Sequence, residues 1–251
     1  MDKFSRRRFV ATIGVASVAP AAALLEMAPA EAASPQQMAQ PVSPAEPAKP
    51  VYLFFNHAEV AFIESACERL IPADESGPGA LGAGVPNYLD KQLGGAWGSG
   101  ERLYRSGPWQ SGSPSQGYQL PFTPAELFHA ALRAINRKFE TQGTAFDALS
   151  AEAQDTYLKT LEAGGVDLDG VPSAVFFDML LRMSVEGFFS DPVYGGNRDM
   201  VAWRMIGFPG AYADYYEAID RHGEKFVREP MSIGEDARRH FHADPNIPAS
   251  L

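Results

Sequence analysis

Apolar residues recur every three to four positions along most of the chain, which is the spacing of one face of an α-helix. The first such run predicts a helix over residues 57–71, with Asn56 as its N-cap and Pro72 as its end. A shorter helix is predicted over 86–93, between two glycine-rich stretches. The N-terminal half of the folded region is therefore expected to be helical.

The clearest local signal begins at Thr123. A hydroxyl cap, Pro124 at the first helical position and Glu126 three residues after the cap together form a capping box. The helix that follows has one apolar face, made of Leu127, Phe128, Ala131, Leu132, Ile135 and Phe139. A further helix is predicted over 151–162, where two glycines then stop it.

Residues 172–189 are apolar nearly all round, with a thin polar stripe of Asp178, Arg182 and Glu186. A helix of this kind is normally buried, so we expect it at the centre of the bundle, its stripe facing a polar neighbour or a partner chain. The sequence contains no alternating strand of useful length, no repeat and no phosphate-binding loop. The expected fold class is all-α: one irregular helical bundle with long Gly/Pro-rich loops.

The N-terminus has the pattern of an export leader. Ser5, Arg6, Arg7 and Phe9 form a twin-arginine signal, and an apolar run to residue 25 and small residues near 30–32 follow it. The alternative is an ordinary secretory signal with adjacent arginines. The apolar run contains a glycine and a proline and is too short for a membrane anchor. We expect a cleaved signal peptide over 1–32, a disordered Pro/Ala-rich tether over 33–50, and a folded domain over 51–251.

Charge and cysteine content narrow the function. The whole chain has a formal charge of −10, and residues 33–251 hold 17 basic and 28 acidic residues, or −11, which argues against nucleic acid as a partner. The single cysteine, Cys67, allows neither an internal disulfide nor covalently attached haem. Its position on an apolar helix face predicts a buried, inert thiol, and pairing with another chain is the alternative.

The sequence shows no catalytic signature. His240, His242 and Asp244 are the only arrangement that invites a metal, but a third well-placed ligand is missing, so exposed tail residues are the better interpretation. We expect no catalytic, cofactor-binding or metal-binding residues in this chain.

Two loops stand out. The first comprises Asp191, Tyr194, Gly195, Gly196, Asn197, Arg198 and the downstream Trp203. It is either a packed turn, whose glycines supply unusual dihedral angles, or a rigid loop that displays polar groups to a partner. The second is the 106–121 loop, where Trp109 and Tyr118 are candidate anchors of an arm that contacts a partner. An ordinary solvated loop is the alternative.

Taken in order, four features resemble the gluconate 2-dehydrogenase subunit 3 (gamma chain) family. They are the SRRRF leader, the helix end ERLIP with its acidic glycine-rich turn, the short helix with Tyr88-Leu89-Asp90, and DPVYGGN followed by W-x-x-x-GFPG. The family comprises small subunits of flavin-dependent, membrane-associated sugar and sugar-acid dehydrogenases. Its fixed polar positions correspond here to Asp191, Tyr194, Asn197 and Trp203.

The resemblance implies a non-catalytic accessory subunit. FAD would belong to a large dehydrogenase subunit and haem c to a multihaem cytochrome c subunit. The complex would lie in the periplasm, peripheral at the inner membrane, after export by the twin-arginine translocase. Two other classes stay open: a stand-alone periplasmic enzyme with an unrecognised site, and a helical ligand-binding protein.

Overall fold

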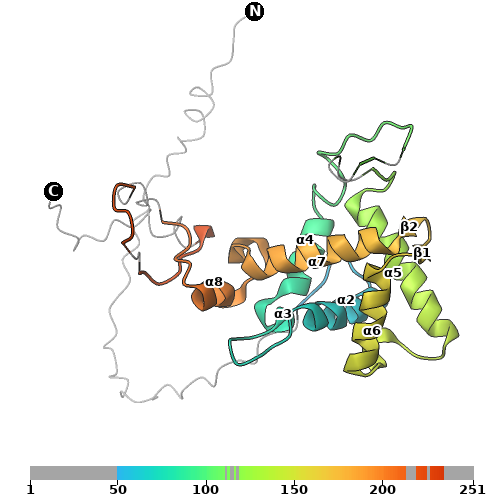
Figure 1. Ribbon diagram of the computed structural model, residues 1–251, viewed down its shortest axis with the longest axis horizontal. Coiled ribbons are helices and arrows are strands. Elements are labelled where there is room, and N and C mark those ends of the chain that lie inside the picture. Colours follow the sequence, from blue (N-terminus) through green and yellow to red (C-terminus); the bar gives the residue numbers. More distant parts are fainter. Residues whose placement is uncertain are drawn as a thin grey trace, which may run out of the picture. The chain divides into compact units, whose positions relative to one another are not determined.

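The computed structural model describes residues 50–110, 112, 113, 116, 119–212, 219–224 and 227–234. The export leader, nearly all of the tether, Tyr118, His240, His242 and Asp244 lie outside these residues. The domain that begins near residue 50 is mainly helical, which confirms the expected fold class at this level (Figure 1).

Four longer helices form the body of the domain: α2 (His57–Leu70), α5 (Pro124–Thr141), α6 (Ala151–Glu162) and α7 (Ser173–Phe189). Short helices complete it: α3 (Ala80–Ala83), α4 (Val85–Leu93), α8 (Val201–Ile206) and the 3-10 turns η2 (Phe146–Ala148), η3 (Pro192–Tyr194) and η4 (Arg198–Met200). The two-residue strands β1 (Asp167–Leu168) and β2 (Val171–Pro172) pair antiparallel, with Leu168 opposite Val171, just before α7.

The predicted caps form as the local sequence indicates. Asn56 accepts hydrogen bonds from the backbone N–H groups of Ala58 and Glu59, and the Glu59 carboxylate accepts from Asn56 N–H. Thr123 and Glu126 make the same reciprocal pair at the start of α5. Each box satisfies backbone donors that a helix start leaves without intrahelical partners.

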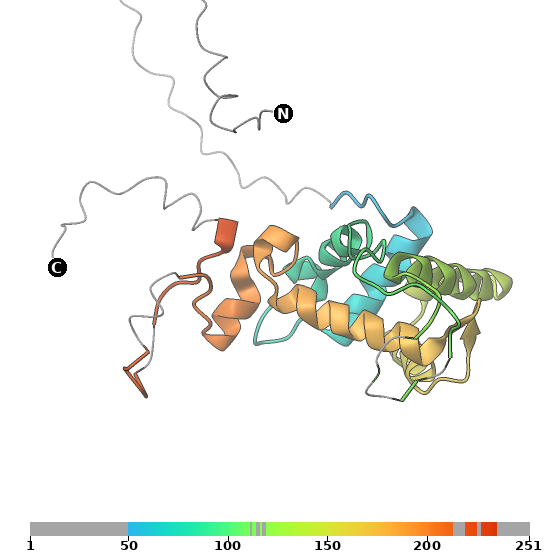
Figure 2. The same cartoon turned by 90° about the horizontal axis from the view of Figure 1, so that it is seen from above.

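Helix α7 lies at the centre of the packing, in contact with α2, α4, α5 and α6 (Figures 1 and 2). Phe176 on α7 meets Phe128 of α5 at a ring-centroid distance of 5.3 Å and Phe62 of α2 at 6.2 Å. All three rings are fully buried and join the three helices in one aromatic core.

The expectation that the apolar positions of α7 are buried is wrong on one side. Its inward positions, such as Phe176 and Leu180, are buried, but Val185 and Phe189 are 44% and 38% exposed. The surrounding helices cover only part of the surface of α7, so some of its apolar side chains stay exposed. Among the described residues, no helix is both long enough and apolar enough to cross a membrane.

Cys67 is fully buried on α2, which confirms the expected burial. Its Sγ lies 3.6 Å from the Ser184 hydroxyl on α7. Burial raises the pKa of the thiol to about 12, and the contact with Ser184 opposes this rise only in part. The thiol is therefore protonated and shielded while the domain is folded.

Candidate functional site

The N-terminal segment (residues 50–56) is fixed to α4 by one carboxylate. Asp90, which is 3% exposed, accepts hydrogen bonds from the backbone N–H groups of Leu53, Phe54 and Phe55 at 2.9, 2.9 and 3.0 Å. An ionised carboxylate has only acceptors, so three converging N–H donors satisfy it without a cation. Asp90 belongs to the Tyr88-Leu89-Asp90 motif, and its contacts are internal to the domain.

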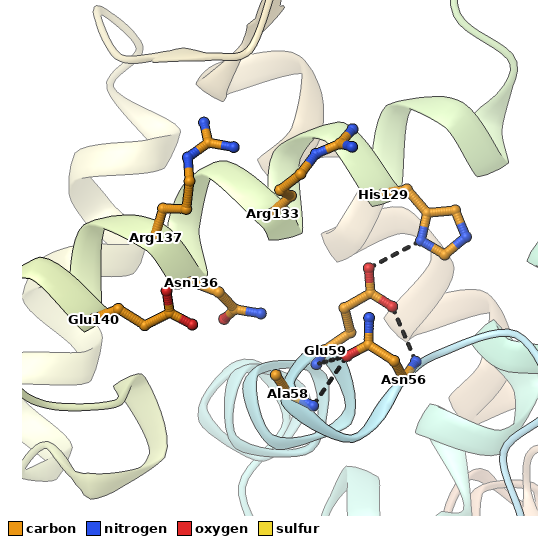
Figure 3. Close-up of a pocket in the computed structure, with 8 residues that line it drawn as sticks. All are labelled: Asn56, Ala58, Glu59, His129, Arg133, Asn136, Arg137 and Glu140. Atoms are coloured by element: carbon orange, nitrogen blue, oxygen red, sulfur yellow. Dashed lines mark hydrogen bonds and ion pairs between the residues drawn. The ribbon is translucent and has the colours of Figure 1, made fainter.

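A pocket of about 450 Å³ opens beside this segment, between the start of α2 and the face of α5 (Figure 3). At one side of it, the buried Glu59 carboxylate lies 2.9 Å from Nδ1 of His129. An ionised carboxylate can only accept, so Nδ1 of the imidazole is the donor. Phe54 stacks on the same ring at 4.2 Å, which fixes the plane of His129.

This carboxylate–imidazole pair has the composition of a general base, but the rest of the pocket does not converge on it. The guanidinium groups of Arg133 and Arg137 point away from Glu59 in Figure 3. They lie 3.8 and 2.5 Å from Asp169 instead. We therefore assign Glu59 and His129 to holding the N-terminal segment against α5. No group of three metal-ligating side chains occurs in the described parts of the chain.

The turn after α7 uses its polar side chains internally. Asn197 is fully buried; its amide donates to the Ser190 carbonyl and accepts from Ala202 N–H, both at 2.9 Å. Asp191 accepts from Val193 N–H at 3.0 Å and from Ile233 N–H at 2.8 Å. The Trp203 indole donates to the carbonyl of Phe189 at 2.8 Å.

The two glycines of this turn serve different purposes. Gly195 has φ +102°, a region that side chains disfavour. Gly196 instead makes a close approach, because an added Cβ would lie 2.0 Å from the carbonyl oxygen of Gly187. The dihedral explanation expected from the sequence therefore fails at Gly196.

The groups that the turn displays are only partly those expected. Asn197 is not among them, whereas Arg198 and Asp199 are exposed. Val193 and Tyr194 are 53% and 50% exposed, and Phe208, which packs edge-on against Trp203, is 43% exposed. The surface of the turn is thus more apolar than the sequence pattern indicated. Its part in partner contact stays a prediction.

The largest concavity among those we describe lies on the other side of α7. We call it the α7 groove: a hollow of about 860 Å³ between the outer face of α7 and the connection from α4 to α5, which passes over α7 in Figure 2. Trp97, Trp109, Leu120 and Pro121 line it on the loop side. On the helix side it is lined by Val175, Asp178, Met179, Arg182, Met183 and Glu186.

The groove brings together two separate sequence predictions, the polar stripe of α7 and the Trp109 loop. Trp109 is 38% exposed, and its neighbour Trp97, which the sequence did not single out, is 43% exposed. Tyr118, the other predicted anchor, lies outside the described residues.

A family model described as gluconate 2-dehydrogenase subunit 3 matches residues 57–210. The chain belongs to this family. The match begins at α2, ends with the GFPG segment after α8, and contains Asp90, the turn at 191–203 and the α7 groove. No curated protein sequence and no solved structure matches the chain.

Two features of this gluconate 2-dehydrogenase subunit 3 domain were not predicted from the sequence. Asp90 stood within a quoted motif, but its partners lie 35 to 37 residues earlier in the chain. Glu59 was not singled out in the sequence, and its contact with His129 spans 70 residues. Pairings this far apart leave no periodic signal, so only the fold reveals them.

Proposed function

We propose that this chain is a non-catalytic small subunit of a flavoprotein–cytochrome dehydrogenase that oxidises a sugar or sugar acid, of the gluconate to 2-dehydrogluconate type. The observation that carries the proposal is the family match, because its description names a subunit of a dehydrogenase and it spans the helical body. The chain would stabilise the flavin subunit and accompany it through the twin-arginine translocase to the periplasmic face of the inner membrane.

The chemistry of the chain supports an accessory role. Covalent haem needs a pair of cysteines, and this chain has only Cys67, which is buried. The polar groups of the family turn bond within the chain, and the Glu59–His129 pair is engaged with the N-terminal segment. FAD and haem c are accordingly proposed for a large FAD-containing dehydrogenase subunit and a multihaem cytochrome c subunit.

The test is affinity purification of the tagged full-length chain from its native periplasm and membrane fraction, followed by an absorbance spectrum and mass spectrometry of the eluate. A co-eluting large chain with flavin bands, together with haem bands, is the expected result. A colourless, solitary chain would refute the proposal. Sugar-dependent dye reduction by that solitary chain would establish a stand-alone enzyme.

Export is tested separately, with Arg6→Lys and Arg7→Lys combined. If the leader carries the complex, both this chain and the flavin subunit disappear from the periplasm and accumulate in the cytoplasm. Arg8→Lys, which lies outside the predicted pair, is the control. If the periplasm of the double variant contains as much flavin subunit as that of the wild type, co-export is contradicted.

A further inference from the structure

The α7 groove has the length and composition of a peptide-binding trough. Its helix side runs from Ala174 to Glu186, which is about 18 Å at the rise of an α-helix. Val175 and Met179 are half-buried, and Trp97 and Trp109 each remain more than a third exposed. Tryptophan and methionine are enriched in the cores of protein interfaces, where they lose this exposure on binding.

The helix side of the groove offers a face along which a second helix can pack. Val175, Met179 and Arg182 follow each other at intervals of four and three residues along one face of α7. A second helix laid beside such a face presents its own side chains at the same intervals.

The charges of the groove indicate which charge a partner should carry there. Asp178 and Arg182 pair with each other at 3.0 Å across one helical turn. Glu186 is exposed, and its contact in the domain is a long hydrogen bond of 3.5 Å from the Tyr88 hydroxyl. One end of the groove therefore presents a carboxylate that no cation among the described residues pairs with, and it favours a basic residue on the partner.

A second copy of this chain fits these charges poorly. If two α7 helices met antiparallel about Arg182, Asp178 of each copy would face Glu186 of the other, and the two Arg182 side chains would face each other. Like charges placed opposite one another disfavour an interface. The charge pattern thus favours a different chain.

We propose that the α7 groove is the docking surface for an amphipathic helix of the flavin subunit. That helix inserts apolar side chains between α7 and the two tryptophans, and it places a Lys or Arg beside Glu186. This inference rests on the proposed function, since it requires a flavoprotein partner, and it names the face of the domain through which the partner binds.

The first test is co-purification of the flavin subunit with tagged full-length variants. Met179→Lys introduces a charge into the groove, and we expect at least a tenfold loss of flavin subunit in the eluate. Val185→Lys makes the same change on α7 at a position that does not line the groove, and we expect recovery within twofold of wild type. Trp109→Ala should also reduce recovery several-fold. Equal thermal midpoints confirm that the variants are folded.

A second test depends on the charge of the groove rather than on its apolar packing. Glu186→Lys should reduce recovery several-fold at low salt, and the difference should shrink at high salt. Glu162→Lys makes the same charge change at the exposed end of α6 and should have no effect. Equal recovery of Glu186→Lys and Glu162→Lys would overturn the electrostatic part of the proposal.

A photo-crosslinking residue at position 179 covers the case in which Met179→Lys does not fold. A crosslink to a helical peptide of the flavin subunit is expected. A crosslink only to a second copy, or full co-purification of folded Met179→Lys, would overturn the groove proposal and leave the proposed function intact. Absence of the flavin subunit from the wild-type eluate would refute both.

Discussion

Removal of the Asp90 carboxylate is the most direct test of how the domain is held together at its N-terminal edge. In Asp90→Ala, three backbone N–H groups lose their acceptor at once. A hydrogen bond to a charged group contributes about 1.5–3 kcal/mol, and the loss is largest where water cannot replace the acceptor. The cost therefore depends on the burial of each donor.

The three donors differ in their access to water. Phe55 is 5% exposed, so we assign its N–H the full value of about 1.5–3 kcal/mol. Leu53 is 90% exposed and Phe54 is half-buried, so we assign each of these about half of that value. The free energy of unfolding should then fall by about 3–6 kcal/mol. A domain of this size loses about 2–4 °C per kcal/mol, so the melting temperature should fall by at least about 6 °C.

The assay is urea unfolding of the purified chain, followed by circular dichroism, with thermal melts in parallel. Asp90→Asn keeps one acceptor oxygen and should lie between wild type and Asp90→Ala. The control is Asp178→Ala, which removes an exposed pair that contributes about 0.3–0.5 kcal/mol. If Asp90→Ala destabilises the domain no more than Asp178→Ala, the three hydrogen bonds do not hold the N-terminal segment in place.

Three further predictions concern packing, the thiol and pH. Gly196→Ala should lower the unfolding free energy by about 1–3 kcal/mol because its Cβ meets a backbone carbonyl, while Gly77→Ala, with open space around it, should change it by less than about 0.5 kcal/mol in denaturant titrations. Cys67 should resist a disulfide-exchange reagent at pH 8 until the domain is unfolded; rapid labelling of the folded chain would contradict its burial. The Arg69 hydrogen bond lowers the pKa of Asp155 below 3.8, so this pair stabilises the fold above that pH and its contribution is lost as the pH falls below it. In Arg69→Ala, the free energy of unfolding should therefore fall less steeply as the pH is lowered through this range. A slope equal to that of the wild type would count against the pair.

Local signals account for the parts of the fold that could be predicted. The caps at Asn56 and Thr123 each depend on residues within three positions, so the sequence alone identifies where α2 and α5 begin. The predicted helix over 151–162 has the same bounds as α6, and in the structure Ser150 caps it through another local contact. The four-residue α3 was not predicted, because a helix this short has no periodicity to detect.

The candidate site could be predicted only in fragments. The stripe of α7 and the loop around Trp109 were each visible in the sequence, but the groove between them depends on how the connection from α4 to α5 folds back over α7. Likewise, the apolar periodicity of α7 could not show which side its neighbours would leave uncovered. Sequence patterns identify the faces of a helix, whereas burial depends on the number and placement of the elements around it.

In the turn at 191–203, the residues that hold the structure together differ from those that a partner can contact. Its three best-connected polar groups, on Asp191, Asn197 and Trp203, bond to the backbone of α7, of α8 and of the segment near Ile233. A buried polar group that loses its partner costs stability, so changes at these positions should act first on folding. Any partner that binds this turn must instead contact the exposed side chains, which include Tyr194. Three of the four polar residues that mark the family in the sequence thus hold the turn together. The fourth, Tyr194, is available for contact together with Val193, Arg198 and Asp199.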